Sequence, residues 1–137
     1  MREIKFRVWC NNKDEWEQNE WLVSRNGEII DIGYMKPLLE SNHILMQYIG
    51  RQDINGKEVY EGDVIKFQSD IIGWEHIGVV LFKDCSFMIQ MPAMSAYRWT
   101  DYTIEKLGHA FVLDGIDTME DVENNIERII NYYKARK

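Results

Sequence analysis

The segment from Leu45 to Phe67, LMQYIGRQDINGKEVYEGDVIKF, constrains the fold more than any other part of the chain. Its apolar runs are short and are separated by Gly50, Gly56 and Gly62. Asn55-Gly56 is a tight-turn signal, because a type I′ turn needs positive φ at both central positions. Short strands and tight turns packed into 23 residues predict a β fold.

Further strands are predicted on both sides of this segment. Ile4, Phe6 and Val8 alternate with Lys5, Arg7 and Trp9, which predicts a strand with one buried face. Asn26-Gly27 lies between two apolar runs and predicts a hairpin. The other runs predict strands over residues 43–49, 64–68, 77–82, 87–91 and 104–112, with a candidate edge strand over 97–103.

Two glycines have a predicted place in these strands. Gly50 is expected to end the strand that begins at His43. Gly108 lies inside the last predicted strand and indicates a bulge there.

The end of the chain has a helical pattern. Thr118-x-x-Asp121 is typical of a helix start, since the hydroxyl can cap and the carboxylate lies near the positive end of the helix dipole. An amphipathic helix is predicted over residues 117–135. Its apolar stripe is formed by Val122, Ile126, Ile129, Ile130 and Tyr133. The stripe requires a partner, either the sheet of the same chain or a helix of another subunit.

The 137 residues fit one domain with three parts. These are N-terminal strands and a hairpin over 1–44, a barrel-like β core over 45–112, and the helix. Glu61-Gly62-Asp63 before a strand, followed by a loop and a hairpin, is similar to a small SH3-type barrel. In such a turn, Asp63 can bond backbone amides. The predicted fold class is mainly β, a multi-sheet domain with a partial SH3-like barrel and one C-terminal α-helix.

Charge and hydropathy indicate the compartment. No apolar run approaches the ~18 residues of a membrane-spanning helix, so no membrane partner is expected. The first residues, MREIKFRVW, lack the apolar centre of a signal peptide, and we expect a cytoplasmic protein of a bacterial cell. The net charge of −7 disfavours non-specific binding to nucleic acid.

The residue types that most often carry chemistry are scattered. His43, His76 and His109 are far apart in the sequence, and neither Cys10 nor Cys85 belongs to a CxxC motif or a histidine cluster. We therefore expect no catalytic residue, no metal, no disulfide and no cofactor.

Four carboxylates lie close together in the central segment, at Asp53, Glu58, Glu61 and Asp63. Paired carboxylates can bind magnesium or act as acid and base. The alternative, which we favour, is that the two Asp residues bond the backbone of turns and the two Glu residues face solvent.

The chain has five tryptophans, and 137 residues cannot easily bury them all. Trp74 and Trp99 lie in polar surroundings and are the predicted interface residues. Aromatic residues of this kind could also stack on the bases of a single strand.

Several motifs together resemble the YopX family of small phage and prophage proteins. These are REIKFRVW at 2–9, the 45–67 segment, GVVLF and SFMI within 78–89, and EKLGHAF at 105–111. The resemblance implies a phage or prophage origin, a mainly β multi-sheet fold with a partial barrel, and self-association. It implies no enzymatic activity and supplies no functional residues. The family's Asn-Ile-Tyr-Glu-Asn-Pro ending after a glycine is absent here, where Gly108 is followed by His109-Ala110-Phe111.

We therefore predict a non-enzymatic, phage- or prophage-encoded protein that forms homo-oligomers and binds a host or phage protein. The alternative is a regulator linked to nucleic acid, which binds single strands on an aromatic barrel face or mimics DNA with its acidic helix. The residues predicted to carry the interaction are Trp74, Trp99, Ile126, Ile129, Ile130 and Tyr133.

Overall fold

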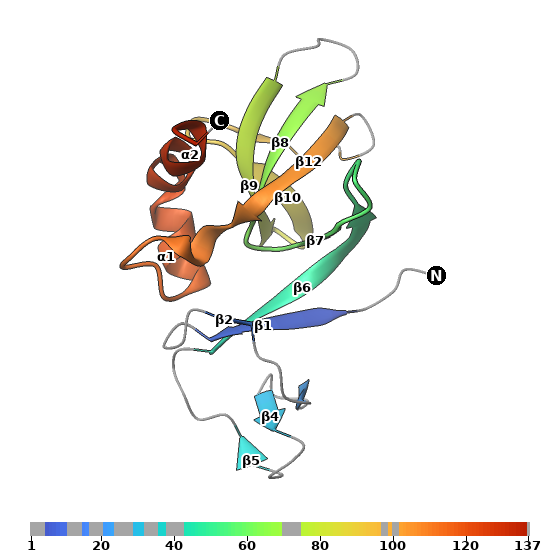
Figure 1. Cartoon of the computed structure of the whole chain (residues 1–137), viewed down its shortest axis with the longest axis vertical. Helices are drawn as coiled ribbons and strands as arrows, with labels where there is room; N and C mark the ends of the chain where they lie inside the picture. The colour runs from blue at the N-terminus through green and yellow to red at the C-terminus, as the bar shows by residue number, and fades with distance from the viewer. Residues whose placement is uncertain are drawn as a thin grey trace.

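The structure is a computed structural model. It describes residues 5–10, 15–16, 21–23, 29–31, 36–37, 43–69, 75–96, 99 and 102–136. Within these ranges the fold is mainly β, and a half-barrel sheet is packed against C-terminal helices, as the sequence predicts (Figure 1).

The strands of the described residues form three antiparallel sheets. The four-stranded sheet has the order β2 (Glu15–Trp16), β1 (Phe6–Cys10), β6 (His43–Gln52), β7 (Glu58–Tyr60). The five-stranded sheet has the order β11 (Ser95–Ala96), β10 (Ser86–Gln90), β9 (Glu75–Lys83), β8 (Asp63–Ser69), β12 (Tyr102–His109). The small sheet has the order β3 (Trp21–Val23), β4 (Ile29–Asp31), β5 (Lys36–Pro37).

The five-stranded sheet is buried on both faces because its side chains alternate between two cores. Val64, Val79 and Met88 belong to the core beneath the helices. Their sequence neighbours Ile65, Val80 and Ile89 belong to the core inside the half-barrel. The two cores explain why these strands are continuously apolar rather than alternating.

The turn after β6 closes one edge of the half-barrel. The amide of Ile54 donates to the carbonyl of Ile104 on β12 at 3.0 Å. The carboxylate of Asp53 accepts the amide of Lys106 on the same strand at 2.8 Å. Arg51 donates to the carbonyls of Trp99 and Tyr102. The turn is thereby fixed against β12.

Several local predictions are confirmed. Gly56 has a φ of 80°, as expected in a tight turn, but φ of Asn55 is not positive, so the turn is not of type I′. The register of β12 on β8 shifts between Lys106 and Gly108, which is the predicted bulge. β3 and β4 pair as the hairpin pattern predicts, although Asn26 and Gly27 themselves lie outside the described residues.

Two strand predictions in the first half of the chain differ from the structure. β6 does not end at Gly50. The strand continues to Gln52. Gly50, with a φ of 90°, lies where the register of β6 on β7 shifts between Tyr48 and Gln52, and the strand resumes beyond it. β1 does not have one buried face, since Val8, Trp9 and Cys10 are all buried while Phe6 is 37% exposed. The end of β1 is enclosed by both β2 and the helical side of the molecule.

The strand predicted over 104–112 ends at His109, and a 3₁₀ turn, η2 (Ala110–Val112), follows. The predicted C-terminal helix is present but is divided at Asn125, whose φ of −129° is not helical, into α1 (Met119–Asn124) and α2 (Ile126–Lys134). The predicted cap is confirmed, because Thr118 and Asp121 bond each other's backbone amides.

The sheet is the partner of the apolar stripe. Ile126, Ile129 and Ile130 are buried in the core that β9 contributes to, and Val122 joins them from α1. The sequence allowed the stripe to pack either on the sheet of the same chain or on a helix of another subunit. In the structure it packs on the sheet of the same chain. These side chains are thus part of the core of their own chain.

Gly108 offers a direct test of how α2 packs on β12. A Cβ atom at this position would lie 2.3 Å from the hydroxyl oxygen of Tyr133. We expect Gly108→Ala to lower the free energy of unfolding by about 1–3 kcal/mol through overpacking, measured by urea denaturation.

The matched control is Gly56→Ala, where a Cβ would meet nothing within 4 Å and only the positive φ is strained. Equal losses in the two variants would contradict the close approach of Tyr133 to the bulge.

Candidate interaction site

Asp63, at the start of β8, is fully buried and is the centre of a polar cluster. One carboxylate oxygen accepts from Arg7 of β1 at 2.5 Å. The other accepts the amide of Tyr60 at 2.8 Å and lies 3.2 Å from the ammonium of Lys106 on β12. Burial raises the pKa of Asp63, and Arg7 and Lys106 act in the opposite direction.

Aromatic rings enclose the guanidinium of Arg7. Its carbon lies 4.3 Å from the ring centre of Trp16 and 4.7 Å from that of Tyr60. His109 completes the cluster, with its ring centre 4.4 Å from that of Trp9 and 5.2 Å from that of Trp16. Burial, with the charge of Arg7 and Lys106, lowers the pKa of His109 to about 4, so the ring is neutral and its Nδ1 accepts the amide of Phe111.

All four carboxylates of the central segment have partners within the chain. Asp53 accepts the amides of Asn55 and Lys57, and Glu58 pairs with Lys5. Glu61 accepts the amide of Gln47, and burial raises the pKa of Glu61. The prediction that both Asp side chains bond the backbone of turns is confirmed. Glu58 and Glu61, which were predicted to face solvent, are only half-exposed.

The described residues contain no group of three or more His, Cys, Asp and Glu side chains placed to hold a metal ion. Cys10 is buried, and Cys85 is exposed in the β9–β10 turn with a φ of 64°. The polar cluster connects β1, β8 and β12, because Arg7 and Lys106 both pair with Asp63.

A second feature, the helix groove, has an open surface. Two adjoining hollows of about 330 and 270 Å³ run between the helices and the β9–β11 side of the sheet and share Met91 and Pro92. We define the helix groove by its apolar lining, which is Ile77, Leu81, Met91, Pro92, Ala93, Met94, Ile126 and Ile130.

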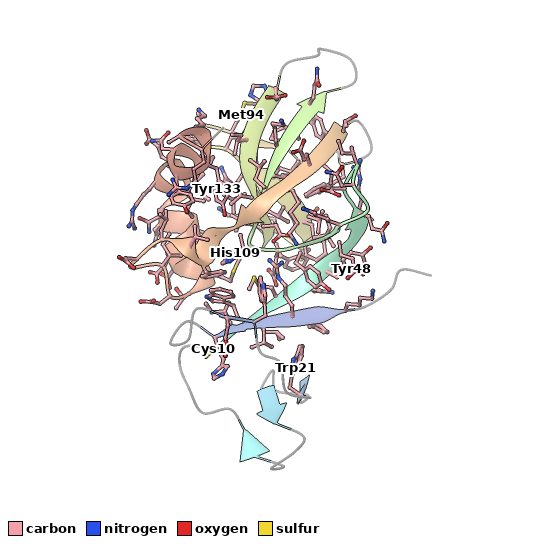
Figure 2. The ribbon with its side chains drawn as sticks, viewed as in Figure 1. Cys10, Trp21, Tyr48, Met94, His109 and Tyr133 are labelled. Atoms are coloured by element: carbon pink, nitrogen blue, oxygen red, sulfur yellow. The ribbon has the colours of Figure 1, made fainter. Side chains whose placement is uncertain are left out.

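The loop from Pro92 to Met94 projects beside the helix groove. All three side chains are exposed, and that of Met94 is exposed to 62% (Figure 2). The loop is also held firmly. The amide of Met91 donates to the carbonyl of Met94 at 2.9 Å. The side-chain amide of Gln90 donates to the carbonyls of both Met91 and Met94. An apolar side chain is thus presented to solvent on a fixed backbone.

Charged side chains mark the two ends of the helix groove. Glu75 of β9 and Lys134 of α2 line one hollow. Lys83 of β9 with Glu123 and Glu127 of the helices lines the other. Each end therefore carries both signs of charge, on opposite sides.

The predicted interaction residues lie in different surroundings in the structure. Trp74 lies outside the described residues. Trp99 is half-buried, packs on the barrel core, and donates its indole N–H to the carbonyl of Phe87 at 3.0 Å. Tyr133 donates its hydroxyl hydrogen to the carbonyl of His109 at 2.7 Å. Burial is the main cause that raises the pKa of Tyr133 to about 12.

The sequence analysis assigned no role to the Pro92–Met94 loop. The available signal was composition, because Pro92 marks a loop and two apolar residues, Ala93 and Met94, follow it directly. No pattern could have shown that the helices end beside it.

The family is decided by comparison of the sequence. The model of the YopX protein family matches residues 5–108. The chain belongs to the YopX family. Comparison with curated proteins gives no match.

Solved structures share the fold of this YopX family member. Protein yopX from Bacillus subtilis is 18% identical with a TM-score of 0.55, and the match covers 85% of this chain and 98% of that one. Protein EF1440 from Enterococcus faecalis is 18% identical with a TM-score of 0.56, and the match covers 81% and 95%. In the described part of the chain, neither helix has the length and apolarity needed to span a membrane.

Removing the central charge of the polar cluster should lower the free energy of unfolding by a large amount. Asp63→Asn leaves Arg7 and Lys106 partly buried without a counter-charge, and we expect a loss of about 3–5 kcal/mol in the free energy of unfolding. The triple variant Arg7→Met, Asp63→Leu and Lys106→Met should lose less, since all three charged members of the cluster are then apolar. Urea denaturation measures both variants. A triple variant less stable than Asp63→Asn would show that the unpaired charges are not the source of the loss.

The lowered pKa of His109 predicts that the free energy of unfolding depends on pH. The folded protein holds His109 with a pKa of about 4, against an ordinary value of 6.5. Between these values the unfolded state binds more protons, so the free energy of unfolding should fall as the pH is lowered from about 6.5 to 4. After allowance for solvent screening, we expect a loss of about 1–2 kcal/mol from this group.

The measurement is the difference between the native protein and His109→Asn across this range, because other titrating groups cancel in that difference. The Asn side chain can still accept the amide of Phe111. Parallel stability curves for the two proteins would show that His109 is not buried in its neutral form.

Proposed function

We propose that this YopX family protein is a non-enzymatic interaction module that self-associates and binds proteins through the helix groove. The observation that carries the proposal is the exposed Met94, held on a rigid loop beside an apolar hollow. Methionine suits such a surface because its unbranched side chain adapts to irregular partner shapes. At 62% exposure, most of this side chain lies outside the core and is available to a partner.

The helix groove has the usual anatomy of a protein interface. Pro92, Ala93 and Met94 supply exposed apolar side chains, and charged side chains also line the two hollows. The loop needs no ordering on binding, because hydrogen bonds from Gln90 and Met91 already fix it. Preorganisation of this kind lowers the entropic cost of association.

The proposal includes the phage or prophage origin and the cytoplasmic location that the family resemblance and the sequence suggested. The alternative function, binding of nucleic acid on an aromatic barrel face, receives less support. Trp99 is engaged by the carbonyl of Phe87 and by the barrel core rather than presented as a stacking surface. A solvent-facing set of acids on the helices is compatible with either function.

A photo-crosslinking amino acid in place of Met94 tests the proposal. The variant is expressed in bacteria and irradiated, and we expect covalent adducts with protein, because Met94 would lie inside an interface. The matched control carries the same group at Ile54, which is 60% exposed on a tight turn outside the helix groove. Adduct yields at position 94 no higher than at position 54 would contradict the proposal.

A further inference from the structure

We propose that the helix groove binds a segment of another protein that carries both cationic and apolar side chains. The inference rests on the proposed function and names the chemical class of its partner. It is carried by Glu123 and Glu127, two exposed carboxylates that line one of the two hollows. Lysine or arginine side chains of the partner pair with these carboxylates, while an apolar side chain of the same segment packs against Met94.

Both carboxylates are available to a partner. In the described part of the chain, neither Glu123 nor Glu127 takes part in an ion pair. By contrast, Glu75, which lines the adjoining hollow, already pairs with Lys66 at 3.9 Å. The oxygens of Glu123 and Glu127 can therefore accept charge-assisted hydrogen bonds from ammonium or guanidinium groups.

The hollow that these carboxylates line has a net negative charge. Lys83 is the one cationic side chain in its lining, against two carboxylates. The negative charge also extends along the chain, because the sequence has six acidic residues and no Lys or Arg in residues 113–127. These are Asp114, Asp117, Glu120, Asp121, Glu123 and Glu127. Such a surface attracts a basic segment during diffusional encounter and repels an acidic one.

Glu123 lies where its own helix disfavours a negative charge. It is the penultimate residue of α1, and the last turn of α1 has no basic side chain. The C-terminal end of a helix favours cations. The charge of Glu123 therefore opposes the helix dipole, and a cationic partner would offset it. Glu127 differs, since it lies in the first turn of α2, where a negative charge is favourable.

The loop beside the hollow requires an apolar side chain in the same segment. Pro92, Ala93 and Met94 are all exposed, and Pro92 lines both hollows. Because the two hollows adjoin at Met91 and Pro92, one segment can reach both the carboxylates and the loop. The charged contacts would give this interface its sign preference, and Met94 would give it apolar contact area.

Three short labelled peptides test the chemistry of the partner by fluorescence anisotropy at low salt. One contains arginine and leucine, the second arginine and serine, and the third glutamate and leucine. We expect the arginine–leucine peptide to bind the native protein most tightly, because only this peptide supplies both kinds of side chain. An affinity for either of the other two peptides equal to that for the arginine–leucine peptide would overturn the inference, as would a native protein that binds none of them.

Charge variants then locate the bound peptide. Glu123→Gln with Glu127→Gln should raise the dissociation constant of the arginine–leucine peptide roughly fivefold, and Lys83→Gln should lower it. The matched control is Asp114→Asn with Glu120→Gln, which removes the same charge from exposed positions outside the two hollows. Equal responses of the two double variants would overturn the inference, since binding would then follow net charge alone.

Thermal melts of these variants separate binding from folding. Because the charge of Glu123 opposes the dipole of α1, we expect Glu123→Gln alone to leave the melting temperature unchanged or to raise it. A weaker affinity for the arginine–leucine peptide in a protein that melts no earlier supports a role in binding. An unchanged affinity in Glu123→Gln with Glu127→Gln would overturn the inference.

The crosslinker at position 94 separates failure of this inference from failure of the proposed function. Adducts with other proteins, formed by a chain that does not distinguish the three peptides, would overturn the inference and leave the proposed function standing. Adducts that join only two copies of this chain would do the same, because the occupant would then be a second copy. Yields no higher than at the Ile54 control would contradict the proposed function, and the inference that rests on it would fail with it.

Discussion

The buried carboxylate of Asp63 bonds side chains from both of the larger sheets. β1 belongs to the four-stranded sheet and β8 and β12 to the five-stranded sheet, and Asp63 bonds Arg7 across that boundary. It also accepts the amide of Tyr60 and pairs with Lys106. A buried charge is tolerated only when it is paired and hydrogen-bonded, so all three elements must be in place together.

The position of the helix groove follows from this arrangement. The five-stranded sheet has one face inside the half-barrel and the other available to α1 and α2. The helices cover that second face with their isoleucine stripe and leave the helix groove along their border with the β10–β11 loop. The surface proposed for association is therefore the rim of a core contact, where buried apolar residues continue into exposed ones.

Local signals were sufficient for much of the fold. Asn55-Gly56 predicted its turn, Gly108 its bulge and Thr118 its cap, since each depends on hydrogen bonds and dihedral angles within a few residues. The division of the helix at Asn125 was not predictable, because the apolar stripe continues across it without a change of period. The candidate site was predicted only in part: the stripe is real but internal, and the neighbouring Met94 was overlooked.

The sequence by itself determined the β class, the turns, the apolar stripe and the family, because these depend on residue type and spacing along the chain. Only the tertiary structure decided that Arg7 and Lys106 neutralise Asp63, and that the stripe packs within its own chain. It also decided that Glu75 and Lys134 line one hollow and Lys83 and Glu127 the adjoining one. The physical reason is distance in sequence. Ion pairs and grooves join residues from 43 to 59 positions apart in these cases, and no local pattern specifies which distant charges will meet.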